Sequence, residues 1–143
     1  MLVAAILARK GREVFTIDPF ATIGAATELL RTHGIGALVV SDDGVTVSGI
    51  MSERDIVRGL AEVGHQVEGQ PVAALMTADV VTCTPADTTE QLMALVTARR
   101  IRHVPVVDAD RLVGLVSIGD IVAARVHELE EETQLLRDYI TAR

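Results

Sequence analysis

The stretch Gly49-Ile-Met-Ser52-Glu-Arg-Asp55-Ile-Val57 decides the fold, because the chain contains it twice. It returns 65 positions later as Gly114-Leu-Val-Ser117-Ile-Gly-Asp120-Ile-Val122, and both copies share a glycine, two apolar residues, Ser-x-x-Asp and Ile-Val. Upstream of this motif the copies stay aligned at a spacing of 66 positions, and their lead-ins, Val3–Leu7 and Val72–Met76, are also alike. The sequence therefore predicts two equivalent units of roughly 65 residues.

Composition limits the class of protein. With 143 residues, of which 49% are hydrophobic and only 2% aromatic, the two small units are expected to share one aliphatic core. A net charge of −7 argues against nucleic acid and anionic membranes as partners. No apolar run approaches the roughly 20 residues that span a bilayer, and the first residues lack the pattern of a signal peptide. A soluble, cytoplasmic protein that binds no membrane is expected.

Each copy is predicted to run β-α-β-β-α, a mixed α/β (α+β) arrangement. Short β-branched runs that stop at a proline turn indicate first strands, and β-rich runs on either side of an aspartate-containing turn indicate hairpins. The predicted strands are 14–17, 35–40 and 45–51 in the first copy and 80–83, 101–107 and 112–116 in the second, with helices after the caps Thr22, Ser52, Thr88 and Ser117. Residues 61–71, which contain two glycines and a proline, are expected to form the connecting loop.

The Ser-x-x-Asp pair of each copy fits two roles. A carboxylate is the usual acceptor for ribose hydroxyls, and Asp55 and Asp120 fall in the first turn of a predicted helix. Ser52 and Ser117 lie at the helix start, where free N–H groups and the helix dipole favour a phosphate. The same spacing is close to that of a capping box, in which case the pairs only close the helix N-termini. The two roles are compatible, and spacing alone does not separate them.

The repeated motif, together with the strands 35–40 and 101–108, resembles a tandem pair of cystathionine β-synthase (CBS) domains, also called a Bateman module. The resemblance covers about Val3 to Arg125. It implies two repeats packed about a pseudo-twofold axis. We assign residues 1–68, with an N-terminal lead-in helix, to the first repeat, 69–125 to the second, and 126–143 to a C-terminal amphipathic helix.

The resemblance also implies a non-catalytic regulatory module. Its clefts are expected to bind an adenosine-containing ligand, which is AMP, ADP, ATP, NAD or S-adenosylmethionine. No cofactor is required, a homodimer is expected, and the regulated partner is a protein that the sequence does not identify. The alternative is a structural or oligomerisation module with unoccupied clefts.

Ligand contacts follow from the resemblance, residue by residue. Basic residues matching Arg102 and His103 reach phosphates in nucleotide-binding relatives, whereas the first copy has Gly36-Ala37 at these positions. The expected ligand-binding residues are Ser52, Arg54, Asp55, Arg102, His103, Ser117 and Asp120, with Thr16, Ile17, Thr82 and Cys83 from the first strands. Asp120 is expected to be a main contact, because it belongs to the copy with the more basic strand.

The basic residues also have structural explanations. Arg99, Arg100 and Arg102 fit a solvated helix end near a C-terminal dipole, and His103 fits a satisfied structural histidine. Arg54 opposes the dipole of its own helix, so either acids such as Glu53 or a ligand phosphate neutralise it. The segment Lys10-Gly-Arg12 is interpreted as a helix terminus, which could also cover a bound phosphate.

The sequence gives no indication of catalysis or of a metal site. The four histidines, His33, His65, His103 and His127, lie in unrelated segments without metal-ligand spacing. Cys83, the only cysteine, has no neighbouring histidine to activate it and is expected to be a small buried hydrophobe in a strand. An enzyme is therefore not expected.

The tail carries a separate pattern. Val126, Leu129, Thr133, Leu136 and Ile140 step by four and three residues in turn, which is the spacing of a coiled-coil seam. Such a helix either packs on its own repeats or pairs with its twin in a homodimer.

Overall fold

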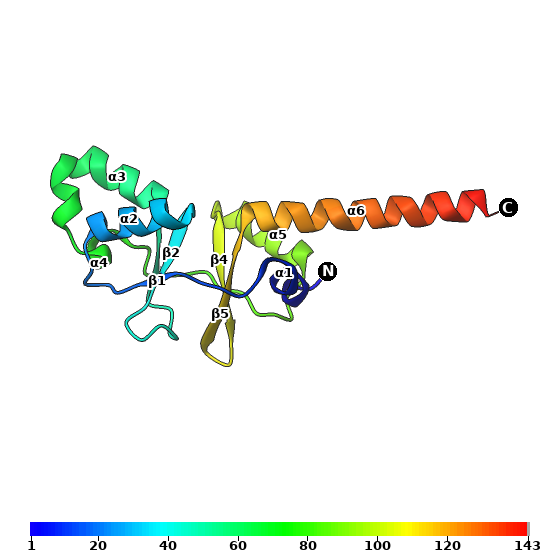
Figure 1. Cartoon of the computed structure of the whole chain (residues 1–143), viewed down its shortest axis with the longest axis horizontal. Helices are drawn as coiled ribbons and strands as arrows, with labels where there is room; N and C mark the ends of the chain where they lie inside the picture. Colours follow the sequence, from blue (N-terminus) through cyan, green and yellow to red (C-terminus); the bar gives the residue numbers. More distant parts are fainter. Residues whose placement is uncertain (143) are drawn as a thin grey trace.

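Residues 1–142 are described by a computed structural model, in which two repeats lie side by side and a long helix extends from one end (Figure 1). The first repeat contains β1 (Thr16–Ile17), α2 (Ile23–His33), β2 (Ala37–Val40), β3 (Gly49–Ser52), α3 (Glu53–Val63), the 3-10 helix η1 (Gly64–Gly69) and α4 (Val72–Leu75). The second contains α5 (Thr89–Arg99), β4 (His103–Asp108), β5 (Arg111–Ser117) and α6 (Ile118–Thr141). Helix α1 (Val3–Lys10) precedes both. The predicted α/β arrangement is confirmed.

Each repeat is built on a small sheet. In the first, β1 runs parallel to β2, which pairs antiparallel with β3. In the second, β4 and β5 pair antiparallel, and Cys83 forms a single parallel bridge to Val106 in place of a third strand. The paired part of each first strand is shorter than the predicted 14–17 and 80–83, and the residues just upstream of it line the clefts described below.

The predicted helix caps are confirmed at Thr22 and Thr88. The Thr22 hydroxyl accepts a hydrogen bond from the Ala25 N–H at 3.1 Å. The Thr88 hydroxyl accepts from the Gln91 N–H at 3.2 Å, while the Gln91 side chain accepts from the Thr88 N–H at 2.8 Å. These bonds satisfy backbone donors that have no partner inside the helix, so α2 and α5 begin where the sequence predicts.

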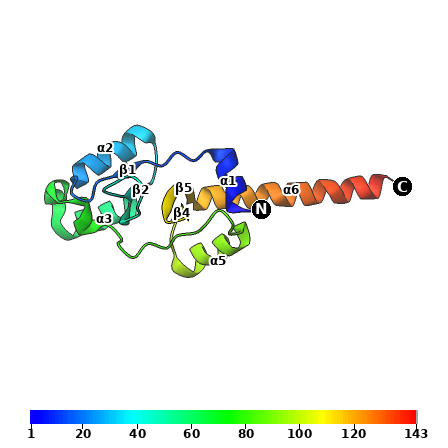
Figure 2. The ribbon, with the colours of Figure 1, turned by 90° about the horizontal axis from the view of Figure 1, so that it is seen from below.

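Each repeat has its own core, so the prediction of a single shared core is wrong. Helix α1 packs on the second repeat, where Leu7 lies in one buried cluster with Cys83 and Val116. Helix α4 packs on the first repeat, where Val72 is buried with Met51. Figure 2 accordingly places α1 beside α6 and close to α5, away from α2 and α3. The segment before each repeat thus completes the core of the other one.

The motif glycine of each repeat permits this close packing. A Cβ atom on Gly114 would lie 2.6 Å from Leu7 Cδ2, and one on Gly49 would lie 2.5 Å from Met76 Sδ. A side chain at either position would collide with the lead-in segment, which would have to shift. The division of the chain at residues 68 and 125 stays a prediction. Helix α1 was assigned to residues 1–68, but it packs in the core of the second repeat.

The prediction of a connecting loop over 61–71 is wrong in its first part. Helix α3 continues to Val63, and η1 follows directly. Val67 of η1 is 1% exposed and belongs to the first core. The buried valine therefore holds the connecting segment against the first repeat. The glycines at 64 and 69 favoured the prediction of a loop, so this contact was not predicted.

Helix α6 has two different halves. Ile121 and Ala124 are buried in the second core, and the Thr89 hydroxyl donates to Glu128 Oε1 at 2.9 Å. From Leu129 to Ala142 every residue is exposed, and Figure 1 shows this half projecting from the body. The alternative in which the tail packs on its own repeats is therefore wrong for this half. Within residues 1–142 no helix combines the length and the apolar character needed to cross a membrane.

Candidate functional site

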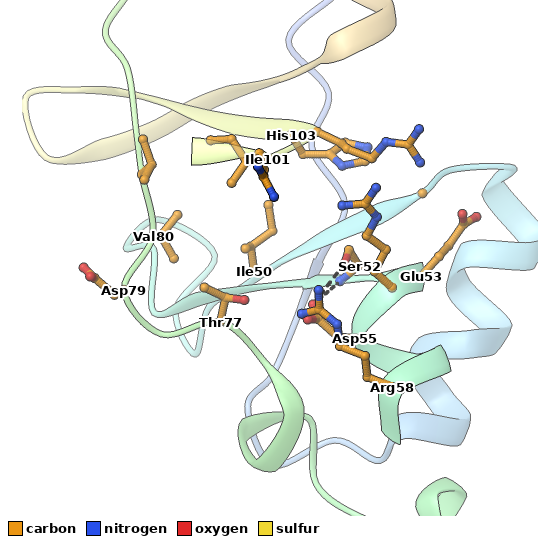
Figure 3. A pocket seen from close by; sticks show the side chains of 15 residues that line it. Ile50, Ser52, Glu53, Asp55, Arg58, Thr77, Asp79, Val80, Ile101 and His103 are labelled. Carbon is orange, nitrogen blue, oxygen red and sulfur yellow. Dashed lines mark hydrogen bonds between the residues drawn. The ribbon is translucent and has the colours of Figure 1, made fainter. Parts of the chain in front are cut away.

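Two clefts lie between the repeats at positions related by the sequence repeat. The first has a volume of about 180 Å³ and combines the β3–α3 junction of the first repeat with residues 100–103, 77 and 79–81. The second has a volume of about 420 Å³ and combines the β5–α6 junction with residues 34–37, 10–11 and 13–15. Each cleft thus takes its Ser-x-x-Asp turn from one repeat and the start of its facing strand from the other. Figure 3 shows the first cleft, with Ser52 and Asp55 facing Ile101 and His103.

The Ser-x-x-Asp turns close the helices as one of the two predicted roles requires. Asp55 Oδ2 accepts hydrogen bonds from Ser52 N at 2.9 Å and from the Ser52 hydroxyl at 3.0 Å. Asp120 Oδ2 accepts from Ser117 N at 2.9 Å, and the Ser117 hydroxyl accepts from Asp120 N at 3.1 Å. Both aspartates are half-buried and line their clefts, so capping leaves them in place to meet a ligand.

Positive charge gathers in the first cleft. Its lining includes four arginines and three acids, namely Arg54, Arg58, Arg100, Arg102, Glu53, Asp55 and Asp79. Within the described part of the chain, none of these arginines lies within 4.0 Å of a carboxylate oxygen. Arg54 therefore has no ion pair with Glu53 to offset its position in the first turn of α3. Arg99 lies outside the lining, in agreement with a solvated helix end.

Arg100 holds an unusual backbone conformation at the edge of this cleft. It follows the last residue of α5 with φ 54°, and its counterpart in the first repeat is Gly34, with φ 61°. This left-handed region suits glycine and is unfavourable for a residue with a Cβ atom. An arginine at a position that favours glycine places a guanidinium at the cleft.

His103 lies where the two repeats meet and lines both clefts. A Cβ atom on Gly36 would lie 3.4 Å from His103 Cε1, so the starts of β2 and β4 are in contact here. Burial lowers the pKa of His103, and the nearby Glu53 carboxylate offsets this only in part. The imidazole is therefore neutral near pH 7, as a structural histidine would be, but it also faces the arginines of the first cleft.

The second cleft has a different electrostatic character. Its lining contains no arginine among the described residues, and the Lys10 ammonium donates to Asp120 Oδ2 at 2.6 Å. Burial raises the pKa of Asp120, but the hydrogen bonds from Lys10 and Ser117 outweigh it and the net shift is downward. Asp120 was expected to be a main contact because its copy has the more basic strand, but Asp120 and Arg102 line different clefts, since the facing strand of each cleft comes from the other repeat.

Several predicted contacts lie elsewhere. Thr16, Ile17, Thr82 and Cys83 are not among the residues that line the two clefts. Ile17 and Cys83 are buried in the cores, as predicted for Cys83, and burial together with Asp87 raises the pKa of the Cys83 thiol to about 12. The sequence analysis missed Arg58 and Asp79. Arg58 lies three residues after Asp55, on the same face of α3, and this helical spacing could have identified it.

No group of three or more His, Cys, Asp or Glu side chains within residues 1–142 is arranged to hold a metal ion.

Comparison with known proteins gives the class. The profile of the CBS domain matches residues 5–62 and again residues 72–127. The chain therefore belongs to the CBS-domain family and contains two CBS domains in tandem, as the repeated motif predicts.

Individual relatives support this assignment. The chain is 39% identical over 123 residues to the CBS domain-containing protein CBSX3, mitochondrial, of Arabidopsis thaliana, covering 83% of this chain and 60% of that protein. It superposes on the CBS-domain containing protein ATU1752 from Agrobacterium tumefaciens with a TM-score of 0.84 and 48% identity, covering 87% and 99% of the two chains. The CBS domain pair of protein MJ0100, solved in complex with 5′-methylthioadenosine and S-adenosyl-L-methionine, matches with a TM-score of 0.78 and 26% identity over 90% and 98%. The chain spans less than two thirds of the Arabidopsis relative.

Proposed function

We propose that this CBS pair is a regulatory module that binds a phosphorylated adenosine ligand in the first cleft. The observation that carries the proposal is the presence of Asp55 and four arginines in one cleft between the repeats. The MJ0100 pair, which has the same fold, binds adenosine-containing ligands. Of the expected ligands, AMP, ADP, ATP and NAD fit this cleft better than S-adenosylmethionine. S-adenosylmethionine has no phosphate for the arginines to bind, and its positively charged sulfur would be repelled by them.

Three groups of residues in the first cleft fit the three parts of such a ligand, which are the ribose, the phosphate and the adenine ring. Asp55, held by Ser52, offers a free carboxylate oxygen to the ribose hydroxyls. Arg102 and its neighbours offer planar forks of donors to phosphate oxygens. Ile50, Val80, Val81 and Ile101 supply apolar surface for the adenine ring. No step in this account needs catalysis or a further cofactor.

Regulation follows from the position of the cleft. A ligand that touches both repeats binds most tightly to one relative packing of them, and so it shifts the protein towards that packing. The surface presented to a regulated protein then changes with ligand concentration. We infer a cytoplasmic location for this regulation, although the Arabidopsis relative is mitochondrial.

Calorimetry with AMP, ATP, NAD, S-adenosylmethionine and adenosine tests the proposal. We expect AMP to bind and Asp55→Asn to weaken AMP binding at least tenfold, because the change removes one charged acceptor while keeping the capping geometry. Asp120→Asn is the matched control and should leave AMP affinity within about twofold. A phosphorylated ligand at 100 times its dissociation constant should also stabilise the fold by about 2.7 kcal/mol. If none of the five compounds binds or stabilises the protein, the alternative of a structural module replaces this one.

We also propose that the chain is a homodimer joined by the exposed half of α6. Leu135, Leu136, Tyr139 and Ile140 are 64–71% exposed, and the predicted seam includes two of them. Each large side chain buried at an interface contributes on the order of 1.5–3 kcal/mol. Truncation after Glu132 should therefore reduce the dimer to a monomer in analytical ultracentrifugation, while thermal stability at low concentration stays unchanged. A dimer of undiminished stability after truncation would remove this half of α6 from the interface.

A further inference from the structure

The second cleft is lined by a positively charged side chain, that of Lys10. Lys10, the last residue of α1, donates from Nζ to Asp120 Oδ2 and to the Leu115 carbonyl oxygen, both at 2.6 Å. Asp120 corresponds to Asp55 in the repeat, and Leu115 corresponds to Ile50. The ammonium therefore sits on the group that a ribose would meet in this cleft.

The first cleft has no such cation. In the register of the lead-ins, in which Leu7 matches Met76, Lys10 corresponds to Asp79, an acid that lines the first cleft. Within residues 1–142, Asp55 accepts hydrogen bonds only from Ser52. The two clefts thus share their backbone plan, but one carboxylate is open to a ligand and the other is already paired.

The exchange of the lead-in helices fixes Lys10 in this position. Ile6 and Leu7 of α1 are 4% and 1% exposed in the second core, so the end of the helix is held beside β5. The Lys10 side chain is 34% exposed and that of Asp120 is 25% exposed, so the pair is partly shielded from water. A ligand hydroxyl that approached Asp120 would have to displace an ammonium with two hydrogen bonds.

We propose that Lys10 closes the second cleft to adenosine, so that each chain binds one adenosine ligand and not two. This inference rests on the proposed function of the first cleft, whose stoichiometry it limits. Lys10 acts here as a specificity-determining residue, because it decides which of two similar clefts accepts a ligand.

The charges that remain without Lys10 indicate what the opened cleft would accept. The other charged side chains in its lining are Glu13 and Asp120, and His103 is neutral near pH 7. Such a lining repels phosphates. An uncharged adenosine compound is therefore the suitable probe, and 5′-methylthioadenosine is one.

Calorimetry with 5′-methylthioadenosine on the full chain tests the inference. Lys10→Met removes the ammonium but keeps an unbranched side chain of similar length. We expect one molecule bound per wild-type chain, two per Lys10→Met chain, and one again in the double variant Lys10→Met/Asp120→Asn. Arg9→Met is the control, since it removes the neighbouring cation, which has no hydrogen bond to Asp120, and should leave one molecule bound.

The outcomes separate this inference from the proposed function. Two molecules bound per wild-type chain, or no additional molecule in Lys10→Met, would overturn the role of Lys10. No binding to wild type but one molecule bound to Lys10→Met, lost in the double variant, would support the role of Lys10 and overturn the proposal for the first cleft. If Lys10→Met unfolds at lower temperature than wild type, Lys10→Gln repeats the test with a polar side chain that keeps a donor to Leu115.

Discussion

In the first cleft Asp55 faces four arginines, whereas in the second cleft Asp120 faces a lysine that is already bonded to it. Both clefts have the same helix start, the same capping turn and the same facing strand, because the two repeats have one fold. They differ where Arg102 replaces Gly36 in the facing strand, and where Asp79 takes the place of Lys10 after the lead-in segment. The repeat therefore gives two clefts of similar plan, and we propose that these few side chains determine which of them accepts a ligand.

The comparison also shows that neither cleft belongs to one repeat. The Ser-x-x-Asp turn comes from one repeat, and the facing strand and the upstream segment bring in residues of the other part of the chain. The two cores are also built from both parts of the chain, since α1 completes the core of the second repeat and α4 completes that of the first. A ligand in either cleft would thus contact both repeats, so its binding would depend on how the repeats pack.

The largest expected effect comes from breaking the exchange of lead-in helices. Leu7→Ala should lower the free energy of unfolding by about 2–5 kcal/mol, because it leaves a cavity in the second core. Hydrogen exchange should increase in β4 and β5, while β2 and β3 keep their protection. Urea unfolding and amide exchange measure these two quantities.

Leu2→Ala is the control for this prediction, since Leu2 is 48% exposed and should change stability by less than about 0.5 kcal/mol. Loss of protection confined to β2 and β3 would contradict the assignment of α1 to the second core.

Local features of this fold could be predicted from the sequence, and long-range ones could not. The caps at Thr22 and Thr88 and the Ser-x-x-Asp turns follow from spacings of three residues, which fix hydrogen bonds within one helical turn. The exchange of lead-ins does not follow, because Val3–Leu7 and Val72–Met76 are nearly interchangeable as sequences. Only packing against Gly114 or Gly49 distinguishes them.

The candidate site divides in the same way. Asp55, Arg102 and His103 were each identified from the chain, but the pairing of Arg102 with Asp55 depends on how the repeats face each other. The contact between Lys10 and Asp120 joins residues 110 positions apart, and no local pattern indicates it. Thr16 and Thr82 lie one residue beyond the residues that line the clefts, because the paired part of each first strand begins later than expected.

A second prediction sharpens the contrast in charge between the clefts. Arg102→Gln should weaken AMP binding about tenfold to a hundredfold, as expected for the loss of a charged hydrogen bond of roughly 1.5–3 kcal/mol. Adenosine affinity should stay within about twofold, since adenosine has no phosphate for Arg102 to meet. Calorimetry with both ligands measures the difference.

Arg99→Gln is the matched control for Arg102, because Arg99 has the same charge but lies outside the cleft. Equal losses for AMP and adenosine would show that Arg102 is not a phosphate contact.

A third prediction concerns the histidine that both clefts share. Burial lowers the pKa of His103 in the folded protein, so its contribution to stability is present above the unfolded value near 6.5 and is lost as pH falls below it. A phosphate in the first cleft favours the imidazolium, so AMP should raise this pKa and affinity should increase about threefold from pH 7.5 to pH 6. NMR titration of the His103 ring with and without AMP measures the shift. His127, on α6 and outside the lining of both clefts, is the control, and its ring signals should not change when AMP is added.

The smallest expected effect tests why Arg100 occupies a position at which the first repeat has Gly34. Arg100→Gly relieves a left-handed conformation that costs roughly 1–2 kcal/mol, and the greater freedom of glycine in the unfolded chain offsets part of this gain. The net result should be a more stable protein by about 0.5–1 kcal/mol, or a melting temperature roughly 1–3 °C higher. AMP affinity should fall severalfold in the same variant, because the guanidinium no longer reaches the cleft. Gly34→Ala, at the equivalent position of the second cleft, is the matched control and should lower stability while leaving AMP affinity unchanged. If Arg100→Gly gains stability without losing affinity, the strain at Arg100 has no connection with the ligand, and the first cleft relies on Arg54, Arg58 and Arg102 for its positive charge.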